Sequence, residues 1–105
     1  MLALSSAKRS PAAPDVPTVA EVTGINDYDF TLWAGFFAPR GTPQPVIDRL
    51  NKEINKVIED PDVKARLEAA GAVVTAMSVA QFKDFVRNES AKYLRVIRET
   101  GVTSQ

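Results

Sequence analysis

A run of aromatic and branched residues at positions 29–38 places the strongest constraint on how this chain can fold. Apolar side chains follow one another along the run, so both faces of an extended segment would be apolar. This pattern is typical of a strand buried on two sides, as in a sheet covered by helices. Gly35 interrupts the run, and a glycine inside a strand often marks a bend. We therefore predict a buried strand here, with Trp33 interpreted as a core residue rather than a ligand platform.

Capping signals predict one helix before this run and one helix after it. Thr18 with Glu21 forms a capping box for a short helix over residues 18–23, although the same pattern also occurs in ordinary surface loops. Thr42 is a good N-cap, and Pro43 suits the first helical position because its missing N–H costs nothing there. Apolar residues at three- and four-residue spacing then predict an amphipathic helix. The stripe consists of Val46, Ile47, Leu50, Ile54, Val57 and Ile58.

Two more helices are expected in the second half of the chain. Asp60 and the proline after it form a cap and a first helical residue, and Gly71 supplies a left-handed stop. Ser78 with Gln81 forms another capping box, which opens the longest helix at about residues 79–100. Together with short strands at 2–6 and 72–76, the order of elements predicts an α/β fold with a helix-rich second half.

Composition excludes several classes of function. Thirteen basic residues balance thirteen acidic ones, so charge gives no support for nucleic-acid binding. The chain has no cysteine and no histidine, which removes thiolate and imidazole metal sites and histidine-based triads. No glycine-rich phosphate-binding motif is present, so nucleotide binding lacks support, and we expect no cofactor. No apolar run approaches the roughly 20 residues that a membrane-spanning helix needs.

Several polar residues allow both a functional and a structural interpretation. Asp27 and Asp29 could form a carboxylate pair, but loop polarity explains them better because no third ligand stands at a fixed spacing. Lys8 and Arg9 could meet an anionic ligand or could simply be solvated. Glu89 lies on or beside the apolar stripe of the last helix, as a buried acid or, in the interpretation we favour, as a solvated edge residue.

Hydroxyl groups near the start of the chain give a weak indication of ligand binding. Ser5 and Ser6 stand at the end of the first predicted strand, before a loop in which prolines restrict the backbone. Helix starts follow at two later threonines. Uncharged donors of this kind favour an anion such as a carboxylate.

A set of segments distributed along the sequence carries a family resemblance: residues 2–11, 14–21, 28, 33–39, 41–43, 50–54, 60–63 and 67–71. In this combination the sequence resembles the tripartite tricarboxylate transporter substrate-binding (Bug-type) family. The resemblance covers essentially the whole chain, and it depends on the combination of segments rather than on any one of them.

The resemblance implies a C-terminal portion of a two-lobed fold like that of type II periplasmic binding proteins. Residues 1–38 would be the end of the second lobe and a crossover strand, and residues 39–105 would be the C-terminal helical part of the first lobe, together one incomplete domain. Met1 would stand where the family has an interior strand residue, so we expect a truncation, with the signal peptide and most of the first lobe upstream. The family also implies a periplasmic location, capture of a small carboxylate or amino acid, delivery to membrane transporter subunits, and no catalysis.

Four residues would lie near the ligand cleft by resemblance: Ser5, Ser6, Asp15 and Thr18. Most of the groups that hold the ligand would be upstream, so we expect no ligand binding by this chain alone. An alternative is an interaction module that forms homo-oligomers, because apolar surfaces and strand edges would otherwise be exposed. A small carboxylate-dependent hydrolase is the least favoured interpretation, since no suitably separated pair of acids is evident.

Overall fold

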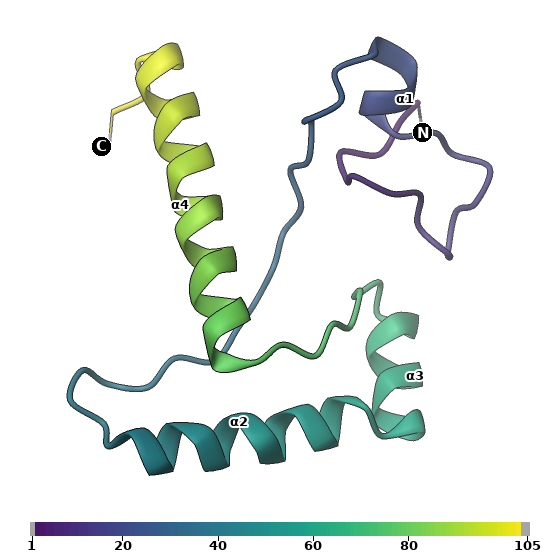
Figure 1. Ribbon diagram of the computed structural model, residues 1–105. Coiled ribbons are helices and arrows are strands. Elements are labelled where there is room, and N and C mark those ends of the chain that lie inside the picture. Colours follow the sequence, from purple (N-terminus) through teal and green to yellow (C-terminus); the bar gives the residue numbers. More distant parts are fainter. Residues whose placement is uncertain (1, 104–105) are drawn as a thin grey trace. The chain divides into compact units, whose positions relative to one another are not determined.

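The computed structural model describes residues 2–103, which contain four helices joined by turns and extended segments (Figure 1). The helices are α1 (Val19–Thr23), α2 (Gln44–Ile58), α3 (Pro61–Ala69) and α4 (Val79–Thr100). The described residues divide into two compact units, one ending at Phe37 and the other beginning at Ala38. None of the four helices is both long enough and apolar enough to cross a membrane.

The predicted ends of α1 are confirmed by the hydrogen bonds at its caps. The Thr18 hydroxyl accepts from the Glu21 backbone N–H at 3.2 Å, and the Glu21 carboxylate accepts from the Thr18 N–H at 2.7 Å. This reciprocal pair is a complete capping box. Gly24 ends the helix with a φ of 76°, a left-handed conformation that glycine adopts without steric cost.

The predicted bounds of α4 are confirmed in the same way. The Ser78 hydroxyl accepts from the Gln81 N–H at 3.1 Å, and the Gln81 side chain accepts from the Ser78 N–H at 2.8 Å. The helix then continues for 22 residues to Thr100 and ends at Gly101 in the left-handed conformation. Both ends are therefore set by residues at the expected positions.

The start of α2 differs by one residue from the prediction. Gln44 is the first helical residue, and Pro43, expected inside the helix, is the N-cap. The Thr42 hydroxyl, expected to cap the helix, donates instead to the Pro39 carbonyl at 2.7 Å. The Thr42 N–H donates to the same carbonyl at 3.2 Å. Because Thr42 closes this preceding turn, the helix begins only after it.

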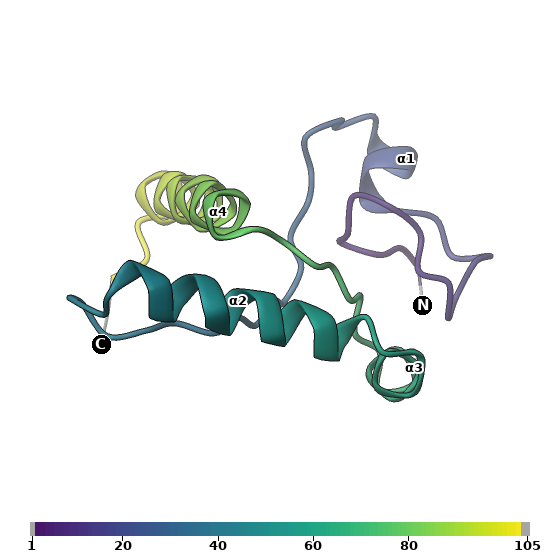
Figure 2. The same ribbon diagram turned by 60° about the horizontal axis from the view of Figure 1, so that its bottom comes forward.

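In the second unit, a side-chain cap sets the start of α3, and two asparagines connect α2 to the start of α4. Asp60 caps α3 as predicted, since its carboxylate accepts from two backbone N–H groups of the first turn. The segment 70–78 then returns beside α2 to the start of α4 (Figures 1 and 2). Asn51 and Asn55 on α2 both donate to the Met77 carbonyl, at 3.0 and 2.8 Å. These bonds attach the start of α4 to α2.

Residues 2–6 do not form the predicted strand. Leu4 makes an isolated parallel bridge with Thr18. The Leu4 N–H donates to the Pro17 carbonyl at 2.9 Å, and the Leu4 carbonyl accepts from the Val19 N–H at 2.8 Å. A strand requires this pattern to continue along a ladder, but the neighbouring chain turns into α1 immediately after Thr18.

The predicted strands at 29–38 and 72–76 are also absent from the described residues. Both stretches are without regular secondary structure, and several of their apolar side chains are exposed: Leu32 at 103%, Phe36 at 77% and Val73 at 79%. A strand needs a neighbour to satisfy its backbone N–H and C=O groups, and residues 2–103 supply no ladder for either stretch. The expected α/β architecture is therefore observed only as its helical elements, with extended segments in place of strands.

Burial is low throughout the described residues. No hydrophobic side chain among them is buried, whereas the polar residue Thr18 is only 1% exposed. The Glu89 side chain is 13% exposed and pairs with Lys92 at 2.7 Å. Its second oxygen, Oε2, is buried and accepts no hydrogen bond within the described part of the chain. Our favoured interpretation of Glu89 as a solvated edge residue is therefore wrong.

Candidate functional site

Three of the four predicted site residues lie at or beside one short stretch of backbone in the first unit, residues 4–7: Ser5 and Ser6 within it, and Thr18 bridged to it. On one side of this stretch lies the bridge between Leu4 and Thr18. On the other side, the Ser5 carbonyl accepts from the Phe30 N–H at 2.8 Å, and the Ala7 N–H donates to the Asp29 carboxylate at 3.1 Å. Residues far apart in the sequence therefore hold the two serines from both sides.

An arginine closes the proline-containing loop that follows the serines. Arg9 Nε lies 3.1 Å from each carboxylate oxygen of Glu21, and the Arg9 Nη2–Glu21 Oε1 distance is 3.0 Å. Arg9 Nη1 also donates to the Pro14 carbonyl at 3.1 Å. Glu21 in turn accepts from the Thr18 N–H at 2.7 Å. We call this group of four residues, Arg9, Pro14, Thr18 and Glu21, the loop clamp.

The loop clamp has a clear electrostatic consequence. The hydrogen bond from Arg9, followed by the bond from the Thr18 N–H, lowers the pKa of the Glu21 carboxyl to about 2. The same hydrogen bond to Glu21 raises the pKa of the Arg9 guanidinium. Each group thus favours the charged form of the other, as expected for a close arginine–carboxylate pair.

Two turns complete the loop between the ends of the clamp. The Ala13 N–H donates to the Ser10 carbonyl at 3.0 Å, and the Val16 N–H donates to the Ala13 carbonyl at 3.1 Å. The Ser10 hydroxyl also accepts from the Ala12 N–H at 3.2 Å. Backbone bonds and the arginine together therefore define the course of the loop.

The four residues predicted from sequence have different environments in this arrangement. Ser5 and Asp15 are exposed. The Ser6 hydroxyl donates to the Lys8 carbonyl at 2.8 Å. Thr18 is buried, and its hydroxyl caps α1. Three of the four therefore have side chains that reach the surface of the loop.

Two residues of this region were not singled out as site residues by sequence reasoning. Arg9 was left between an anion-binding and a solvated interpretation, and Asp29 was assigned to loop polarity. Instead, Asp29 holds the backbone next to the serines, at Ala7, and Arg9 holds the loop that follows them, at Pro14. Their partners stand 12 and 22 residues away in sequence, so no local spacing pattern indicated them. The capping box at Glu21 was the one local signal that pointed to the loop clamp.

The arrangement offers a mixed set of groups to a small polar molecule. Lys8 is exposed and positively charged, the Ser5 hydroxyl can donate or accept, and the Ser6 hydroxyl, which donates to the Lys8 carbonyl, can still accept. Asp15 is exposed and acidic, so it would repel a carboxylate but attract an ammonium or hydroxyl group. The loop therefore suits a ligand with both anionic and donor groups better than a plain anion.

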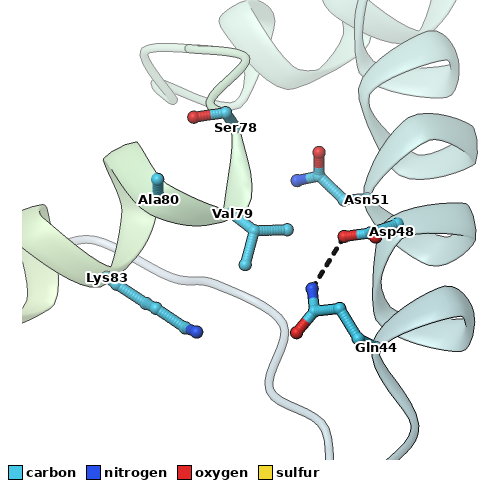
Figure 3. A pocket seen from close by; sticks show the side chains of 7 residues that line it. All are labelled: Gln44, Asp48, Asn51, Ser78, Val79, Ala80 and Lys83. Atoms are coloured by element: carbon cyan, nitrogen blue, oxygen red, sulfur yellow. Dashed lines mark hydrogen bonds between the residues drawn. The ribbon is translucent and has the colours of Figure 1, made fainter.

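The second unit contains an open groove of about 460 Å³ between α2 and the start of α4 (Figure 3). Most of its polar side chains already have partners. Gln44 donates to Asp48 at 2.8 Å, as the dashed line in Figure 3 shows, and Asn51 donates to the Met77 carbonyl. No residue predicted from sequence as a ligand contact lines this groove. Its lining residues are Gln44, Asp48, Asn51, Ser78, Val79, Ala80 and Lys83.

The described residues contain no group of three or more acidic side chains that could hold a metal ion. The first unit therefore remains the better candidate site, since it contains the predicted residues and a loop held by side-chain contacts.

Comparison with known proteins identifies the class of the chain. Residues 1–102 match the model of the tripartite tricarboxylate transporter family receptor. The chain therefore belongs to this family, as the sequence resemblance predicted. Members of the family are periplasmic substrate-binding receptors, not enzymes, with a periplasmic-binding-protein fold, and they work with membrane transporter subunits. This agrees with the prediction that the chain is not an enzyme.

Individual relatives show the same similarity over almost the whole chain. A UPF0065 protein from the tcbD-tcbE intergenic region of Pseudomonas sp. strain P51 is 38% identical over 98 residues, 93% of this chain and 29% of the relative. Protein BugT of Bordetella pertussis is 34% identical over 100 residues, 95% of this chain and 30% of BugT. A UPF0065 protein of Agrobacterium vitis is 30% identical over 102 residues, 94% of this chain and 29% of the relative. The chain thus spans somewhat under one third of these curated relatives.

Proposed function

We propose that this chain forms part of a solute-binding receptor that captures small carboxylates or amino acids for a tripartite tricarboxylate-type transporter. The observation that carries the proposal is the family match over residues 1–102. On this proposal the protein acts in the periplasm and hands its ligand to membrane transporter subunits. Residues 1–38 belong to the end of the second lobe and a crossover strand, and residues 39–105 to the first lobe.

The proposed ligand contacts are Ser5, Ser6 and Asp15. We propose that Thr18 acts indirectly, through the backbone. Their support is that Ser5, Ser6 and Thr18 lie at one stretch of backbone held from both sides, and that Asp15 follows the Pro14 carbonyl held by Arg9. Asp15 favours an ammonium or hydroxyl group on the ligand, and the Ser5 hydroxyl can donate to its carboxylate. The Ser6 hydroxyl donates to the Lys8 carbonyl and can only accept from the ligand. Thr18 is 1% exposed and contributes through the backbone that it fixes at the start of α1.

We further propose that the 105-residue chain does not bind ligand by itself. The relatives are more than three times as long as the matched region, and a small-molecule pocket needs walls on most sides of the ligand. Within the described residues the proposed contacts lie on one loop of one unit.

A hybrid receptor tests both parts of this proposal. Residues 1–102 would replace the matching 30% of BugT, and calorimetry would measure binding of succinate, citrate and glutamate to the hybrid, to BugT and to the 105-residue chain. We expect at least one of the three compounds to bind the hybrid but none to bind the chain alone. Equal affinity of the chain and the hybrid would contradict the proposal that the 105-residue chain does not bind ligand by itself. A folded hybrid that binds none of them, while BugT does, would contradict the receptor function.

Exposed apolar side chains favour a second candidate function, a homo-oligomeric interaction module. Val46, Leu50 and Val57 on α2 are 46%, 49% and 54% exposed, and their spacing places them along one helix face. On α4, Leu94 and Ile97 are 52% and 45% exposed. Apolar stripes of this kind drive association when no other surface covers them.

The oligomer proposal is tested by light scattering after size-exclusion chromatography of the 105-residue chain. We expect a mass above that of the monomer at high micromolar concentration, and a return toward the monomer in Leu50→Lys. The control is Lys52→Glu, which changes charge at an exposed position of the same helix. A monomer at all concentrations, or equal effects of the two substitutions, would exclude this candidate.

A further inference from the structure

Arg9 is the cation of the candidate site that would ordinarily be assigned to a carboxylate ligand, because arginine forks match carboxylates well. In the structure, the N–H donors of Arg9 instead bind groups of the protein itself. Arg9 Nε and Nη2 contact the two Glu21 oxygens, and Arg9 Nη1 contacts the Pro14 carbonyl. Both partners belong to the loop itself or to the helix that follows it.

The contacts of Arg9 connect the two ends of the loop. Arg9 stands at its beginning, Pro14 near its middle, and Glu21 in the first turn of α1. Glu21 also accepts a hydrogen bond from the Thr18 N–H at 2.7 Å, so it connects Arg9 to the start of α1. Asp15, a proposed ligand contact, follows Pro14 directly, so the carbonyl held by Arg9 belongs to the peptide unit that precedes Asp15.

We propose that Arg9 is a positioning residue, which fixes the loop that carries Asp15 by binding Glu21 and the Pro14 carbonyl and does not itself contact the ligand. This inference rests on the proposed function for its ligand, but the contacts that carry it lie wholly within the first unit. The neighbouring Lys8 makes none of these contacts, so the two adjacent cations have separate roles.

The adjacent lysine provides a matched control for the first experiment. Arg9→Met and Lys8→Met each remove one positive charge from the same loop of the 105-residue chain, and carbon-detected NMR would follow the Glu21 carboxyl through acid titration. We expect Arg9→Met to move the Glu21 transition upward toward the ordinary glutamate range, and Lys8→Met to leave it in place. Hydrogen exchange of the Thr18 amide should quicken only in Arg9→Met. An unmoved Glu21 transition would overturn the proposal.

The second experiment separates positioning from direct contact. In the BugT hybrid, calorimetry with succinate, citrate and glutamate would compare Arg9→Met, Glu21→Gln and the double variant. We expect each single variant to weaken binding by about three- to tenfold, and the double variant to weaken it no further, because both changes remove one clamp. Arg9→Lys, which keeps the charge but not the fork, should recover part of the affinity.

The outcomes distinguish this inference from the proposed function. Weaker binding in Arg9→Met with unchanged binding in Glu21→Gln would mean that Arg9 contacts the ligand, which would overturn the positioning role. If the folded hybrid binds none of the compounds while BugT does, the receptor function fails, but the NMR titration still decides whether Arg9 holds the loop.

Discussion

At the scale of single residues, the candidate site depends on contacts between side chains and backbone rather than on a cluster of reactive groups. Thr18 is the most buried polar residue described, and it is held by reciprocal bonds with Glu21. The three-residue spacing of this pair made it predictable from sequence. Arg9 was not predictable as its third member, because 12 residues separate it from Glu21 and only the fold brings them together.

Acid should open the loop clamp. The pKa of Glu21 is about 2 in the folded loop against an ordinary value of 4.5, so the folded loop favours the ionised carboxylate. This contribution to loop order is complete above about pH 4.5 and is lost as the pH falls toward 2. Protection of the Thr18 amide, measured as its exchange rate relative to the intrinsic rate at each pH, should therefore fall over this interval in the wild type.

Two variants check the assignment of this acid transition to Glu21. Glu21→Gln should lose the pH dependence of Thr18 amide protection, and Glu53→Gln, an exposed change on α2, should retain it. If Thr18 protection in Glu21→Gln still fell between pH 4.5 and 2, another carboxyl would be responsible.

At the scale of elements, the helices could be predicted from sequence and the strands could not. The bounds of α4 were predicted because a capping box at Ser78 and a glycine at 101 encode its ends within a few residues of each. The strand at 29–38 was predicted from its run of aromatic and branched apolar residues. Such a run indicates that a segment favours burial, but a strand also needs a neighbour that pairs with it as a ladder, and the described residues form no ladder with this segment.

The link between α2 and α4 marks another limit of prediction from sequence. Asn51 and Asn55 stand four residues apart on α2, and both donate to Met77. Their spacing shows that they share a helix face. It does not show that a carbonyl 22 to 26 residues later will face them, because that depends on the turn from α2 into α3 and the return of the chain.

Removing the N-cap of α4 should destabilise this helix. Ser78→Ala leaves the Gln81 N–H without its side-chain acceptor, and losing an N-cap typically costs about 1 kcal/mol. We expect lower helicity by circular dichroism and faster amide exchange in the first turn of α4. Ser90→Ala, at an exposed interior position of the same helix, should preserve or slightly raise helicity, since alanine is the better helix former. Equal losses in the two variants would contradict the role of the cap.

At the scale of the whole molecule, the short match to longer relatives agrees with the low burial of apolar side chains among the described residues. The chain spans somewhat under one third of its curated relatives, and no hydrophobic side chain among residues 2–103 is buried. Burial of apolar area is the main favourable contribution to folding, at roughly 25 cal/mol per Å². The helices described here therefore depend mainly on caps, hydrogen bonds and partial contacts, and the apolar faces of α2 and α4 remain available for further packing.

This balance predicts how the chain will unfold. Segments held by local caps and hydrogen bonds unfold independently of one another, whereas a shared apolar core couples segments into one unfolding transition. The 105-residue chain should therefore unfold broadly in urea, with α1 and α4 losing structure at different concentrations by residue-resolved NMR. In the BugT hybrid, packing of the α2 stripe should join these changes into one steep transition, and Leu50→Lys should lower its midpoint more than Lys52→Glu. A single steep transition of the 105-residue chain at micromolar and lower concentrations would contradict this account, because it would require a shared core that the described residues do not provide.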